Sequence, residues 1–110
     1  ASPKDAALHE VRIKTKRARY AAELALWSVG KPASRFIKRA RAVQDLLGTY
    51  QDALQAEVSL RAFLKAATTV RAGFVIGRLV ERQRARRETV RKRIDGPLKN
   101  VLKQGQKAWN

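Results

Sequence analysis

The chain has 110 residues, enough for one small domain with a single hydrophobic core. Its 25 lysines and arginines against 9 acidic residues give a formal net charge of +16, so we expect an anionic partner such as nucleic acid, an acidic membrane surface or inorganic polyphosphate. The absence of cysteine excludes disulfides and thiolate chemistry, one histidine cannot build a His/Cys metal site, and no apolar run approaches the roughly 20 residues that cross a bilayer.

The periodicity of apolar residues predicts helices throughout, because prolines are few and no alternating strand pattern persists. The first predicted helix runs from about Pro3 to Ser28, and Gly30-Lys-Pro32 ends it. We therefore expect an all-α fold, an antiparallel four-helix bundle, over residues 1–110 as a single domain. The apolar face of the first helix comprises Leu8, Val11, Ala18, Ala22 and Leu26.

The opposite face of this helix is basic. At roughly 100° per residue, four cationic side chains fall within about 80° of one another. These four residues, here called the basic stripe, are His9, Arg12, Lys16 and Arg19. Tyr20 and Glu23 continue the same side and could orient the cations, and Glu23 could pair with the arginine four residues before it. A row of cations about 15 Å long suits an extended polyanion better than a single phosphate.

The second helix is expected from about Pro32 to Leu47, with Gly48 in the left-handed position that ends many helices. Its predicted apolar side comprises Phe36, Ile37, Ala40, Val43 and Leu47. Its opposite side adds three candidate anion-binding residues, Arg35, Lys38 and Arg39. A third helix is expected to start at Asp52 as its N-cap, with Gln55 completing a capping box, and to end near Ala67.

The fourth helix is predicted from about Ala72 to Ile94, and Asp95-Gly96-Pro97 should break it before a last piece that ends near Lys107. Seven cations lie between Arg82 and Arg93, either as ligand contacts or as a solvated face. The third helix is neutral overall, so the anion-facing surface is expected on the first, second and fourth helices. Trp27 and Trp109 are predicted to be packing residues.

Two motifs resemble the CHAD family, the conserved histidine α-helical domain. The run from His9 to Tyr20, followed by Glu23, resembles the family's histidine helix. The run Val43-Gln44-Asp-Leu-Leu47-Gly48, followed by Asp52, resembles the Leu-Gln-x-x-Leu-Gly-x-x-x-Asp hinge between two helices. The basic C-terminal helix ending at Trp109 is a weaker third point of resemblance.

This resemblance implies a fold built from two related four-helix bundles, of which this chain would supply one, the C-terminal half. It also implies binding of inorganic polyphosphate, a cytoplasmic location with association to polyphosphate granules, and frequent fusion to a triphosphate tunnel domain. The expected partners are polyphosphate and either a second copy or a missing N-terminal bundle. Because the chain does not begin with methionine, we expect it to be an excised or truncated piece.

Other functions remain open from the residues alone. An RNA- or DNA-binding module is one, because phosphate contacts do not discriminate between polyanions. An assembly element, or an accessory domain of a phosphate-metabolising protein, is another. No glycine-rich phosphate loop, paired carboxylates or nucleophile–base arrangement is visible, so we expect no catalysis, no cofactor and no metal.

Overall fold

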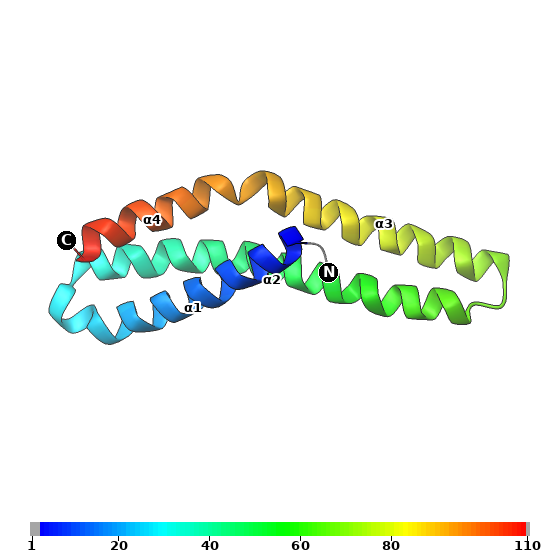
Figure 1. Ribbon diagram of the computed structural model, residues 1–110, viewed down its shortest axis with the longest axis horizontal. Coiled ribbons are helices and arrows are strands. Elements are labelled where there is room, and N and C mark those ends of the chain that lie inside the picture. The colour runs from blue at the N-terminus through cyan, green and yellow to red at the C-terminus, as the bar shows by residue number, and fades with distance from the viewer. Residues whose placement is uncertain (1–2, 110) are drawn as a thin grey trace. The chain divides into compact units, whose positions relative to one another are not determined.

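The computed structural model describes residues 3–109 of the chain, and the side chains of residues 4–106 (Figure 1). Within this part of the chain every regular element is an α-helix, which confirms the all-α prediction. The four helices are α1 (Pro3–Val29), α2 (Lys31–Ala66), α3 (Val70–Arg93) and α4 (Asp95–Trp109). Helix α1 matches the predicted first helix to within one residue at its C-terminal end.

Short breaks separate the helices at three of the places that the sequence indicates. Gly30 alone joins α1 to α2, and its φ of 77° lies in the left-handed region that glycine adopts without steric cost. Thr69 caps α3, since its Oγ1 accepts a hydrogen bond from the backbone N–H of Ala72 at 3.1 Å. Ile94 separates α3 from α4, and Pro97 in the first turn of α4 has no N–H to donate to the carbonyl of Arg93.

The predicted end of a helix at Gly48 is wrong. Helix α2 continues through this glycine, and Asp52 is an exposed residue inside the helix rather than an N-cap. The reason is that the apolar face does not stop at Gly48: Leu47, Tyr50 and Ala53 are all buried at helical spacing. A glycine inside a helix costs about 1 kcal/mol, which continuous burial on both sides offsets.

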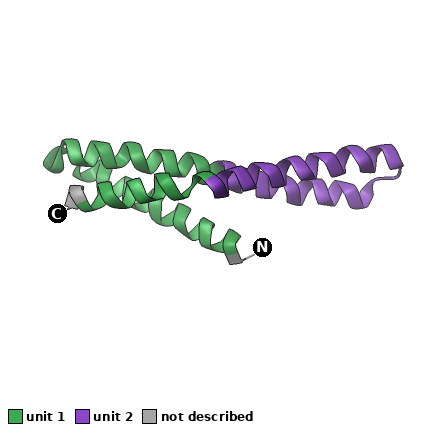
Figure 2. Ribbon diagram, turned by 90° about the horizontal axis from the view of Figure 1, so that it is seen from above, with its two compact units in different colours: residues 1–48, 93–110 green, residues 49–92 purple. Residues whose placement is uncertain are grey.

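The described chain divides into two compact units (Figure 2). Unit 1 comprises residues 1–48 and 93–110, and there α1, the first part of α2 and α4 pack together. All five residues of the predicted apolar side of α2 are buried in its core, which confirms that prediction: Phe36, Ile37, Ala40, Val43 and Leu47. Helix α1 contributes Ala22, and α4 contributes Val101. A Cβ on Gly105 of α4 would lie only 3.1 Å from the Phe36 ring, so α4 approaches α2 closely there.

The prediction that Trp27 packs is wrong, because its side chain is 99% exposed. Trp27 lies seven residues after Tyr20, and this spacing places it on the outer side of α1. Leu24, on the same side, is 86% exposed, and Leu26 is only partly covered. The side chain of Trp109 lies outside the described residues.

Unit 2, residues 49–92, is an antiparallel hairpin of the second part of α2 and α3 (Figure 2). Four hydrophobic residues are buried in this hairpin: Tyr50, Ala53, Val80 and Val90. Polar side chains also join the two helices. Arg87 of α3 donates to a Glu57 carboxylate oxygen of α2 at 2.7 Å.

Candidate functional site

The basic stripe lies on α1 as predicted, but beside its packed face rather than opposite it. His9 and Lys16 are exposed, whereas Arg12 and Arg19 are half-buried, with 18% of the Arg19 side chain accessible. The reason is helical spacing. Arg12 and Arg19 lie three positions before and four positions after Thr15, which is buried, so they border the core.

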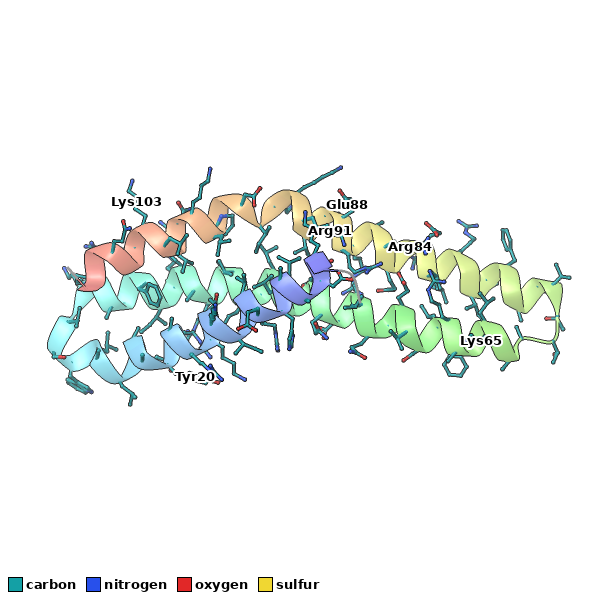
Figure 3. All side chains as sticks on the ribbon, viewed as in Figure 1. Tyr20, Lys65, Arg84, Glu88, Arg91 and Lys103 are labelled. Atoms are coloured by element: carbon teal, nitrogen blue, oxygen red, sulfur yellow. The ribbon has the colours of Figure 1, made fainter. Side chains whose placement is uncertain are left out.

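The Tyr20 ring gathers two cations of the basic stripe. Tyr20 is 46% exposed, and Figure 3 shows it on the outer edge of the helix. The guanidinium carbon of Arg19 lies 5.0 Å from the ring centroid and the ammonium of Lys16 lies 5.8 Å from it. Both distances are within the range of cation–π attraction, so the ring helps to keep these two charges together.

Glu23 forms the predicted ion pair with Arg19, whose Nη1 lies 3.2 Å from Oε1 of the carboxylate. The same oxygen lies 3.6 Å from Nη2 of Arg41, a residue of α2 that is 63% exposed in its side chain. Arg41 is therefore brought next to the basic stripe, and sequence reasoning missed it. The sequence hints at Arg41 only by placing it three residues, about one helical turn, after the candidate Lys38. Its contact with Glu23 depends on how α2 packs against α1, which neither helix shows by itself.

The three candidate residues of α2 are all exposed, and they are not equivalent: Arg35, Lys38 and Arg39. Lys38 lies about 60° around the helix from Arg41, farther from the buried face of α2 than Arg41 is. Arg39 lies about 160° from Arg41 and points away from the basic stripe. Lys38 is therefore nearer than Arg39 to Arg41 around the helix, and both side chains are exposed.

The cations between Arg82 and Arg93 divide into two groups. Arg84 and Arg87 contact Glu57 of α2 at 3.5 and 2.7 Å, and Arg91 donates from two nitrogens to the Tyr50 hydroxyl at 3.1 and 2.7 Å. Arg84 and Arg91 also approach acidic neighbours on α3 itself (Figure 3). These three arginines hold the hairpin of unit 2 together. The others are exposed on α3: Arg82, Arg86, Lys92 and Arg93.

Two features are absent from the part of the chain that the structure describes: a cluster of metal-binding side chains and a membrane-spanning helix. No three histidine, cysteine, aspartate or glutamate side chains there lie close enough together to hold a metal ion. None of the described helices has the length and apolar character needed to cross a membrane.

A comparison with models of protein families identifies the family to which this helical chain belongs. The model of the CHAD domain matches residues 1–61, which include α1 and all of α2 except its last five residues. The chain is therefore a member of the CHAD family, as its two motifs predict. The matched region contains the basic stripe, Glu23, Arg41 and the three α2 candidates. Comparisons with curated proteins and with solved structures found no match.

Proposed function

We propose that the chain binds inorganic polyphosphate electrostatically and performs no chemistry on it. The observation that carries this proposal is the basic stripe, which aligns Arg12, Lys16, Arg19 and the ring of His9 along one edge of α1 in a chain of net charge +16. Membership of the CHAD family supports the same ligand class. We propose a cytoplasmic location, including the surface of polyphosphate granules, as the setting for this binding.

The chemistry of the stripe fits a repeating phosphate chain. Arginine offers a planar fork of donors to phosphate oxygens, whereas lysine supplies a mobile point charge. His9 adds a cation when its ring is protonated. Arg12 and Arg19 are held against the packed face, and Lys16 and His9 extend into solvent, so fixed and adaptable cations alternate along the row.

One observation favours a second candidate, an RNA- or DNA-binding function. Tyr20 is half-exposed and lies against Lys16 and Arg19, which is the combination of aromatic ring and cations on which single-stranded nucleic acids stack. A single ring provides one stacking position, whereas the stripe offers three lysine and arginine cations beside His9. The balance of these features favours phosphate contacts over base contacts.

The proposed site is tested by changing Arg12, Lys16 and Arg19 together to glutamine and titrating the variant with polyphosphate by calorimetry. We expect most of the binding to be lost, because phosphate contacts are removed while glutamine keeps the helix propensity. Since Arg12 and Arg19 border the core, circular dichroism must show unchanged helicity.

The matched control is the change of Lys14 and Arg17 to glutamine, because both are exposed on α1 outside the stripe. We expect this pair to weaken binding much less for each charge removed. Equal losses per charge would show that net charge, and not the basic stripe, explains the affinity.

A further inference from the structure

A single carboxylate, that of Glu23, joins two helices in unit 1. Its Oε1 accepts a hydrogen bond from Arg19 of α1 and faces the guanidinium of Arg41 of α2. Because both arginines approach the same oxygen, their guanidinium groups are neighbours at this place along the two helices. Arg19 is held there by its pairing with Glu23 within α1, whereas Arg41 reaches the same oxygen only because α2 packs on α1.

The charges at this place do not balance. Two guanidinium groups share one carboxylate, and Lys16 lies on the same side of α1 with its ammonium near Tyr20. The excess positive charge is what an additional anionic group would neutralise.

Arg41 is the accessible member of the pair. Its side chain is 63% exposed, against 18% for Arg19, so a ligand in solvent can reach it without displacing the packed face. The 3.6 Å separation from Glu23 is longer than that of the Arg19 contact, and exposed ion pairs of this kind contribute little to stability. A phosphate group can therefore engage Arg41 at little cost.

We propose that Arg41 is a further polyphosphate-binding residue and that Glu23 is a positioning residue, which holds Arg19 and Arg41 side by side for neighbouring phosphate groups of one chain. This inference rests on the proposed function. The proposed site then includes a residue of α2 next to the basic stripe of α1, because Arg41 and Arg19 approach the same carboxylate. Lys38 is an exposed cation three residues before Arg41 on the same helix.

The role of Glu23 can be tested by the sign of an effect. If Glu23 merely places a negative charge near the ligand, its change to glutamine removes repulsion and tightens binding. If Glu23 positions the two arginines, the same change weakens binding although the protein becomes more positive. Glu10 provides the control, because it is an exposed carboxylate on α1 that contacts neither arginine, and Glu10→Gln makes the same change in net charge.

The experiment is a calorimetric titration of the full chain with polyphosphate at fixed salt. We expect Glu23→Gln to weaken binding about threefold and Glu10→Gln to leave it equal or tighter. Arg41→Gln should weaken binding about fivefold, whereas Arg71→Gln, at an exposed arginine of unit 2, should change it less than about twofold. In the Arg41→Gln background, the further effect of Glu23→Gln should shrink, because the two residues act through one contact.

The inference is overturned if Glu23→Gln binds as tightly as Glu10→Gln, or if Arg41→Gln resembles Arg71→Gln. If Glu23→Gln loses helicity, the comparison of Arg41→Gln with Arg71→Gln still tests the inference, because both arginines are exposed. Failure of the proposed function looks different: the unchanged protein would not bind polyphosphate, or the triple stripe variant would bind as well as the unchanged protein does.

Discussion

Arg12 and Arg19 show how the position of one residue on a helix determines its use. Both border the packed face of α1, where their aliphatic stems can lie against apolar neighbours while the charged ends remain near solvent. Glu23 and the Tyr20 ring restrict Arg19 further. Side chains that are already ordered lose less entropy when they bind, so these two arginines are better prepared for a ligand than fully exposed cations are.

In unit 2, Glu57 joins two helices as Glu23 does in unit 1, and its contacts stabilise the hairpin of α2 and α3. Its carboxylate is 14% exposed and contacts Arg87 at 2.7 Å, Arg61 at 3.1 Å and Arg84 at 3.5 Å. We predict that Glu57→Gln lowers the free energy of unfolding by about 1–3 kcal/mol, because charge-assisted hydrogen bonds between the two helices are lost. Urea denaturation followed by circular dichroism measures this change.

Glu81→Gln is the control for that prediction. Glu81 is 68% exposed in its side chain and contacts Arg84 one turn later on the same helix. Its loss should change the free energy of unfolding by about 0.5 kcal/mol or less, as is usual for exposed ion pairs. Similar effects of the two substitutions would contradict the view that Glu57 joins the hairpin.

At the scale of the element, Gly30 and Gly48 look alike in the sequence but differ in the structure. Gly30 has a φ of 77° in the turn between α1 and α2, whereas Gly48 lies within α2, and a Cβ added there would meet nothing within 4 Å. We predict that Gly48→Ala raises the free energy of unfolding by about 0.5–1 kcal/mol, because alanine is the better helix former.

Gly30→Ala should lower the free energy of unfolding by about 1 kcal/mol, since the left-handed conformation is unfavourable for a residue with a Cβ. Thermal and urea denaturation of both variants provide the measurement. Destabilisation by Gly48→Ala would instead indicate the helix end that the sequence predicts at this position.

The sequence predicts α1, the core face of α2 and the break before α4, because each depends on periodicity or on proline and glycine within a few residues. It does not predict that α2 continues through Gly48, since that depends on burial of Tyr50 and Ala53 against a helix distant in the chain. The same limit applies to the site. The basic stripe is visible along one helix, but Arg41 joins it only through the packing of α2 on α1.

At the scale of the whole molecule, the net charge of +16 favours anionic partners. Unit 1 also leaves an apolar groove of about 680 Å³ open to solvent, between α1 and α4, with Val11, Phe36 and Leu102 in its lining. This groove and the exposed Leu24 and Trp27 are the features that favour the assembly hypothesis. Pairing with a second copy or with another bundle stays a prediction, which sedimentation of the chain with and without polyphosphate can test.

The salt dependence of binding follows from the charge. If four cations neutralise four phosphates, the affinity for polyphosphate should fall about fiftyfold when the salt concentration rises fourfold, by the relation established for single-stranded nucleic acids. Longer polyphosphate chains should bind more tightly, because they engage more cations at once. Titrations across a salt series measure this slope, and an affinity that does not change with salt would refute an electrostatic mechanism.

Competition between polyphosphate and RNA of matched charge tests the central claim most directly. A labelled RNA is bound to the protein at fixed salt and displaced by either unlabelled polymer, with concentrations counted in phosphate groups. We predict that polyphosphate displaces the label at about one tenth of the RNA concentration or less, a preference of about 1.4 kcal/mol or more. Equal displacement, or a preference for RNA, would contradict the assignment of polyphosphate as the ligand.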